Sequence, residues 1–112
     1  MKIDFCKSPI SFCGNTPDNN ILDSIEKLKL DVSKKDFDIA IVGCGGYSVI
    51  ISDYIYTEMK KSAIIVGGGI QLFFGIKGKR WNDKNLYNEF WCNVLESEIP
   101  KNKEKVEGGC YF

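Results

Sequence analysis

Apolar residues recur at helical spacing after residue 20. The first twenty residues are rich in turn-forming residues. Four of the apolar residues are four, three and four positions apart, namely Ile21, Ile25, Leu28 and Val32. This spacing places them on one face of a helix. The stretch Asp18 to Asn20 supplies residues that can cap the N-terminus of such a helix. We therefore expect an amphipathic helix that ends near Ser33, before the charged run Lys34-Lys35-Asp36.

Two short apolar runs, each ended by glycine, predict two strands. The run 37–42 stops at Gly43, and the run 63–66 stops at Gly67. The second half of the first run and the whole of the second run are continuously apolar, which is typical of strands that are covered on both faces. Between them, isoleucine and tyrosine recur at helical spacing from Tyr47 to Met59. A strand, a helix and a strand in so short a stretch predict two parallel strands joined by a right-handed crossover.

These elements indicate the α/β class, with a Rossmann-like βαβ unit and a small parallel sheet flanked by helices. The chain of 112 residues has the usual size of one domain, so we expect a single Rossmann-like domain over residues 1–112. A short extended run from Ile10 to Cys13 is a candidate third strand. With so narrow a sheet, strand edges stay unpaired and apolar surface stays uncovered, so we expect a homo-oligomer or a partner chain.

The second half of the chain is rich in aromatic residues. The pattern predicts one or two helical turns from Ile70 to Phe74, a loop from Gly75 to Arg80, and a helix from Asn82 through Trp91. Within that helix Leu86 would pair with Phe90, and Tyr87 with Trp91. We expect four aromatic residues of this region to belong to the core rather than to a ligand site: Phe73, Phe74, Phe90 and Trp91.

The charge balance and the cysteines exclude several classes of function. Fifteen basic and fifteen acidic residues cancel, so no global field attracts nucleic acid, and no apolar run is long enough for a membrane span. The five cysteines are scattered and histidine is absent, so we expect no metal site. Reduced thiols and the absence of a signal peptide indicate a cytoplasmic protein.

The strongest signal for a ligand is a pair of glycine loops. Gly43-Cys44-Gly45-Gly46 lies between the first strand and Tyr47, where the next helix starts, and Gly67-Gly68-Gly69 follows the second strand. Parallel strands bring both loops to one edge of the sheet, where α/β proteins bind ligands. Glycine permits close backbone approach, and a helix N-terminus attracts anions. We therefore expect one shared anion-binding crevice, while tight turns without a ligand remain the alternative.

The first loop matches the dinucleotide fingerprint only in part. Ser48 stands where the third glycine belongs, and the second strand ends without the carboxylate that would hold a ribose. We therefore expect no NAD and no other cofactor. Cys44 lies at a helix start but is better explained as a small filler than as a reactive thiol.

A basic loop follows the second glycine loop. Lys77, Lys79 and Arg80 supply cations that suit phosphate, and Trp81 offers a face on which a base or sugar ring can stack. A solvated basic loop is the alternative. No nucleophile stands beside a base and no acidic pair is evident, so the sequence indicates no catalytic residue.

The stretch from Phe37 to Tyr47, the block from Gly67 to Trp81 and the ending Val106-Glu107-Gly108-Gly109-Cys110-Tyr111 resemble a known group of proteins. These are poorly characterised proteins of capsule and surface-polysaccharide loci, similar to the C-terminal half of GT-D-type glycosyltransferases. The resemblance spans roughly residues 8–112, and its most specific part is the block from Gln71 to Trp81. Those relatives are longer and have an additional N-terminal half.

The resemblance implies sugar transfer from a nucleotide sugar, with the glycine loops near the diphosphate. A chain without the additional half can instead be a binding module, or a non-catalytic α/β interaction module that takes no small molecule. Under the first hypothesis the ligand-binding residues are Gly43, Gly45, Gly46, Tyr47, Gly67, Gly68, Gly69, Gln71, Lys77, Lys79, Arg80 and Trp81. The ligand is then a nucleotide sugar or another phosphate-bearing small molecule.

Overall fold

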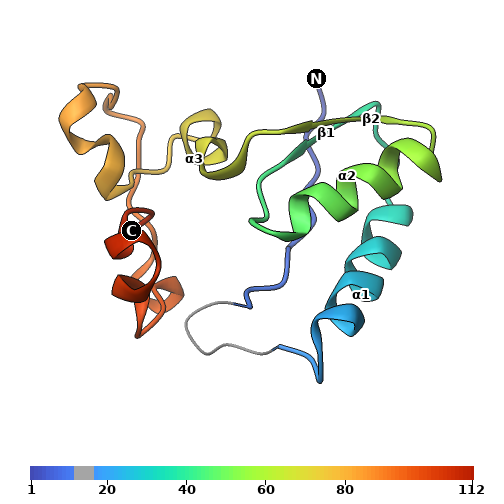
Figure 1. Cartoon of the computed structure of the whole chain (residues 1–112). Coiled ribbons are helices and arrows are strands. Elements are labelled where there is room, and N and C mark those ends of the chain that lie inside the picture. Colours follow the sequence, from blue (N-terminus) through green and yellow to red (C-terminus); the bar gives the residue numbers. More distant parts are fainter. Residues whose placement is uncertain (12–16) are drawn as a thin grey trace.

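The structure, a computed structural model, describes residues 1–11 and 17–112 and has mixed α/β architecture (Figure 1). Its first half contains α1 (Ile21–Ser33), β1 (Ile39–Val42), α2 (Tyr47–Thr57) and β2 (Ser62–Ile65). After β2 the helical segments are short. They are α3 (Ile70–Phe73) and the 3-10 turns Gly67–Gly69, Lys79–Lys84, Glu96–Glu98, Lys103–Lys105 and Glu107–Gly109.

Helix α1 begins and ends where the sequence predicts. Asn20 is the N-cap residue, and its side-chain oxygen accepts a hydrogen bond of 3.0 Å from the backbone N–H of Asp23. This bond satisfies one of the amide donors that a helix start leaves free. Ile25, Leu28 and Val32 are buried along one face, which confirms the amphipathic pattern.

The two strands form a parallel pair with α2 between them in the chain, as predicted. Ile39 pairs with Ser62, and Val42 pairs with Ile65. Each strand has four residues, so β1 starts two residues later than the apolar run indicates. The described residues contain no third strand in this sheet. Of the candidate strand at Ile10 to Cys13, Ile10 and Ser11 have no regular structure, and the other two residues lie outside the described part of the chain.

The core lies on one side of the sheet only. Its buried apolar side chains come from α1, β1 and α2, and Ala40 and Ala63 pack against them from the strands. Figure 1 shows α1 and α2 on the same side of the β1–β2 pair. The expectation that both strand faces are covered is therefore wrong, because the described chain provides no element to cover the second face.

The predicted helix from Asn82 through Trp91 is also wrong. A 3-10 turn spans Lys79–Lys84, and Asn85 then adopts a left-handed conformation with φ of 50°, which an α-helix does not tolerate. The helical path ends there, and Cys92 then forms a parallel bridge with Ile76. Tyr87 and Trp91 are nevertheless in contact, with ring centroids 5.0 Å apart.

Most of the aromatic residues assigned to the core are at the surface. Phe73, Phe74 and Phe90 are exposed, whereas Trp91 is half-buried against the Tyr87 ring. Phe74 contacts Phe5 of the N-terminal segment, with ring centroids 5.6 Å apart. In the described part of the chain, no helix combines the length and the apolar character that crossing a membrane requires.

Candidate functional site

The two glycine loops meet at the carboxyl edge of the sheet. The strands end in register, and the Val66 N–H donates to the Val42 carbonyl at 2.9 Å. A Cβ on Gly43 would stand 2.6 Å from the carbonyl oxygen of Gly67 and 2.8 Å from Cγ2 of Ile70. Real Cβ atoms essentially never come so close to another atom. The contact between the loops therefore requires glycine at position 43.

The first loop closes on its own side chains and carbonyls. Gly45 has φ of +56°, a conformation that favours glycine. The Cys44 N–H donates to Oγ of Ser48 at 3.0 Å, and the Ser48 N–H donates to the Gly45 carbonyl at 3.0 Å. Ser48, which replaces the third glycine of the fingerprint, is buried and holds this turn. Cys44 packs against the core.

Tyr47 and Gly46 lead from this loop into α2. Gly46 is the residue before the helix and has helical dihedral angles. The Tyr47 side chain is buried in the core, and its hydroxyl shares a hydrogen bond with the Ser11 hydroxyl. Tyr47 thus joins the N-terminal segment to α2, and its ring is not presented to solvent at the loop.

The C-terminal segment, residues 107–112, lies against the second loop. Gly67 has φ of +53°. A Cβ on Gly68 would stand 2.5 Å from Cε1 of Tyr111 and 3.1 Å from Nη1 of Arg80. Gly69 has no such neighbour within 4 Å. Gly68 is thus the point at which the glycine loop, the basic loop and the C-terminal segment come together.

Arg80 is the central cation of this cluster. Its Nη2 donates to the Glu107 carboxylate at 2.6 Å and to the Cys110 sulfur at 2.7 Å. Its guanidinium also lies 4.1 Å from the centroid of the Tyr111 ring. The hydrogen bond to Cys110 raises the pKa of Arg80 above its ordinary value, so the side chain stays cationic. The Arg80 side chain is 27% exposed.

Backbone contacts hold the C-terminal segment in place. The Gln71 amide donates to the Tyr111 carbonyl at 2.8 Å, and the Arg80 N–H donates to the Cys110 carbonyl at 3.1 Å. Lys79 reaches the Gly108 carbonyl at 3.5 Å. The sequence predicted Gln71, Lys79 and Arg80 as site residues. It did not predict Glu107, the ion-pair partner of Arg80, although an acidic residue beside the glycines of the tail could have indicated it.

Lys77 and Trp81 lie on other parts of the basic loop. The Lys77 ammonium lies 5.7 Å from the centroid of the Tyr87 ring. The guanidinium of Arg80 lies 5.7 Å from the Trp81 ring, whose buried Nε1 has no hydrogen-bond partner among the described residues. The structure therefore brings Gly43, Gly67, Gly68, Gln71 and Arg80 together, and directs Lys77 toward Tyr87.

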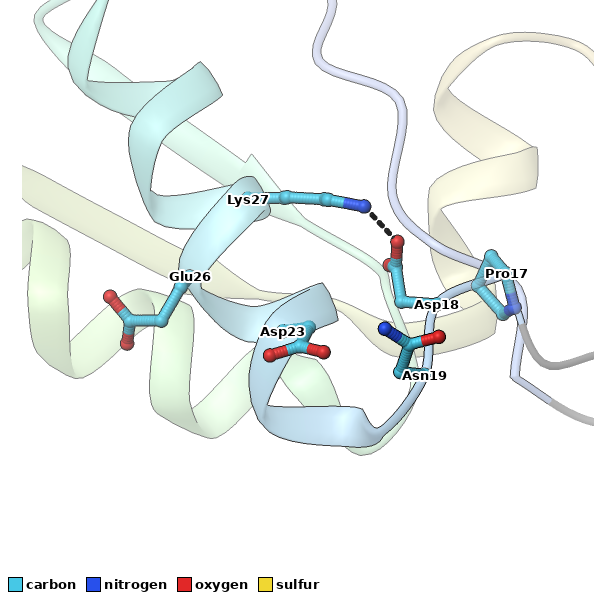
Figure 2. A pocket seen from close by; sticks show the side chains of 6 residues that line it. All are labelled: Pro17, Asp18, Asn19, Asp23, Glu26 and Lys27. Carbon is cyan, nitrogen blue, oxygen red and sulfur yellow. Dashed lines mark hydrogen bonds and ion pairs between the residues drawn. The ribbon is translucent and has the colours of Figure 1, made fainter.

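A surface hollow lies elsewhere, at the start of α1. Figure 2 shows its lining, which consists of Pro17, Asp18, Asn19, Asp23, Glu26 and Lys27. Three of these side chains are carboxylates, and Asp18 forms an ion pair with the lysine. Such a lining repels phosphate, so the hollow does not suit the predicted ligand. Among residues 1–11 and 17–112, no three metal-ligating side chains form a group that could hold a metal ion.

Comparisons of the chain with family models, with curated proteins and with solved structures found no match. The resemblance to polysaccharide-locus proteins therefore stays a prediction from the sequence.

Proposed function

We propose that this protein binds a phosphate-bearing small molecule, a nucleotide sugar or a similar diphosphate, where its two glycine loops meet. The observation that carries the proposal is the position of Arg80. Its Nη1 lies beside Gly68, and its Nη2 already holds a carboxylate oxygen at 2.6 Å. A guanidinium that binds a carboxylate in this way presents the donors that a phosphate uses.

The surroundings of Arg80 support an anion as the ligand. The loops follow the carboxyl ends of parallel strands, which is where α/β proteins place their ligands. Positive φ at Gly45 and Gly67 turns the backbone in a way that lets a ligand approach closely. On this proposal the chain is a Rossmann-like domain of the cytoplasm. The free thiols at Cys6, Cys44, Cys92 and Cys110 are compatible with that compartment.

Sugar transfer is the reaction that the sequence resemblance suggests for such a site. The proposal is limited to binding, because the reactive groups around Arg80 are engaged with one another. The Cys110 thiol donates to the Glu107 carboxylate at 3.4 Å and also accepts from Arg80. Glu107, the carboxylate nearest the cation, is engaged with Arg80 and lies within 3.4 Å of the Tyr111 hydroxyl. A carboxylate bound in this way is a poor general base.

Titration with UDP, UDP-sugars and ATP, followed by thermal shift and calorimetry, tests the proposal. UDP should raise the melting temperature of the unaltered chain. Arg80→Ala should weaken UDP binding by about 2–4 kcal/mol, since charge-assisted hydrogen bonds are lost. Lys84→Ala is the matched control, because Lys84 lies at the other end of the same 3-10 turn. Equal affinities of the two variants, or no binding of any nucleotide, would refute the proposal.

A second function, that of a non-catalytic interaction module, is favoured by a different observation. The first glycine loop uses its own donors and acceptors, as the bond between Cys44 and Ser48 shows. Its glycines then serve the turn, and Arg80 fastens the C-terminal segment. The absence of nucleotide binding in the same titration would favour this function.

A further inference from the structure

One face of the β1–β2 sheet is apolar and uncovered. Residues alternate between the two faces of a strand, so Ala40, Val42 and Ala63 face the helices and their neighbours face away. The outward set, here called the open face, consists of Ile39, Ile41, Ser62 and Ile64. Its isoleucines are 56%, 46% and 53% exposed. Figure 1 shows no helix on that side of the strands.

The chain exposes more surface than a compact monomer of its size. Its accessible surface is 8167 Å², whereas a folded monomer of 12.6 kDa is expected to expose about 6,200 Å². Its radius of gyration is 15.0 Å, against about 13 Å for a compact domain of this length. The molecule is also flat, with extents of 40 × 36 × 20 Å. A monomer thus leaves about 2,000 Å² more exposed than expected.

Taken over the whole chain, this excess is larger than one partner's share of a standard interface. A standard interface buries about 800 Å² on each partner. The open face would supply the apolar centre of such an interface. The Lys61–Asp36 ion pair, 3.3 Å long, flanks the amino ends of both strands and would belong to a polar rim.

We propose that the open face is the interface of a homodimer, in which the sheets of two copies pack face to face. None of its four residues is charged, and in register Ile39 neighbours Ser62 and Ile41 neighbours Ile64. The face therefore carries no charge that would repel its own copy, and a two-fold axis pairs identical surfaces. Stacked sheets lie about 10 Å apart, which leaves room for the isoleucine side chains of both copies.

Light scattering after size exclusion, over a range from about 1 to 100 µM, tests this proposal without any ligand. The unaltered chain should elute with twice the mass of one chain. Ile41→Lys should raise the dissociation constant of the dimer by about a hundredfold or more, because a symmetric dimer would bury two unpaired ammonium groups. The matched control is Val49→Lys on α2, since Val49 is 68% exposed and lies outside the open face.

A dimeric Val49→Lys and a monomeric Ile41→Lys with an unchanged circular dichroism spectrum would support the proposal. If Ile41→Lys fails to fold, Ile64→Thr replaces it, because threonine keeps strand propensity and should weaken the dimer by about tenfold. A monomeric unaltered chain at 100 µM would overturn the proposal. So would a dimer that both open-face variants leave intact, since that dimer would be held by strand edges or by another surface.

Discussion

Gly43 lies directly against the carbonyl oxygen of Gly67. The separation of 2.6 Å between that oxygen and a Cβ at position 43 leaves no space for a side chain. Gly43 directly follows Val42, and Gly67 comes two residues after Ile65, the residue that pairs with Val42 at the end of the sheet. The contact thus links the two loop conformations, and a change at one glycine affects the other loop.

Gly43→Ala should therefore destabilise the protein by about 1–3 kcal/mol, as expected when an atom is forced into a packed site. Gly69→Ala is the control, because a Cβ there meets no atom within 4 Å and φ is −62°. That variant should be neutral or slightly stabilising. Urea unfolding of both variants measures the difference, and equal stabilities would show that the loops separate easily.

Glu107→Gln should tighten the binding of UDP by about three- to tenfold, if the carboxylate of Glu107 occupies the position that a phosphate would take on Arg80. A neutral amide competes less well for a guanidinium than a carboxylate does. Calorimetric titration gives the affinity. Exposed Glu98 offers a control, Glu98→Gln, with the same change in net charge. Weaker binding by Glu107→Gln alone would show that Glu107 supports the site instead of blocking it.

Local sequence patterns were sufficient to predict the first half of the fold. The spacing of Ile25, Leu28 and Val32 predicted α1, and the glycines at 43 and 67 marked the ends of both strands. The single covered face of the sheet was not predictable in this way. An apolar strand with both faces covered and one with a single covered face have the same sequence pattern. Only the number of helices that pack on the sheet distinguishes the two cases.

The sequence also predicted which loops meet, but not how the site is closed. Parallel pairing placed the two glycine loops at one edge, as expected. The contacts of Tyr111 with Gly68 and of Glu107 with Arg80 join distant segments, and Glu107 and Arg80 are 27 residues apart in the chain. Such distant contacts leave no periodic trace. The helix over Asn82 to Trp91 was mispredicted because a tertiary contact, between Tyr87 and Gly78, stabilises a non-helical path of the chain after Asn85.

Tyr87→Phe should destabilise the basic loop by about 1–2 kcal/mol, because it leaves buried groups of Gly78 without their partner. The Tyr87 hydroxyl accepts from the Gly78 N–H at 3.1 Å and donates to the Gly78 carbonyl at 2.7 Å. Tryptophan fluorescence during urea unfolding reports on this region, since both tryptophans, Trp81 and Trp91, lie in it. Tyr56→Phe on the exposed side of α2 should leave the transition unchanged.

Asp18→Asn should make the protein less sensitive to acid. The hydrogen bonds from Lys27 and Ser24 lower the pKa of Asp18 below its ordinary value of 3.8. The unfolded chain therefore takes up this proton at a higher pH than the folded chain does. The stabilising contribution of Asp18 is complete above pH 3.8 and is lost as the pH falls through the lower, folded pKa.

Urea unfolding at pH 7, 5 and 3 gives this comparison. The loss of stability between pH 5 and pH 3 should be smaller for Asp18→Asn than for the unaltered chain. Asp53→Asn, which neutralises an exposed carboxylate on α2, controls for the change in net charge. An identical pH dependence of the unaltered chain and Asp18→Asn would show that the ion pair with Lys27 is too exposed to matter.

The distribution of the core has a consequence for the dynamics of the chain. Among the described residues, every buried apolar side chain lies between Ile25 and Ile55. The segment after β2 is held instead by hydrogen bonds such as that from Gln71 to Tyr111. Regions with little buried apolar surface open at a low free energy, independently of the rest. Amide protons of α1, α2 and the two strands should therefore exchange with solvent slowly, whereas those of residues 75–112 exchange through frequent local openings.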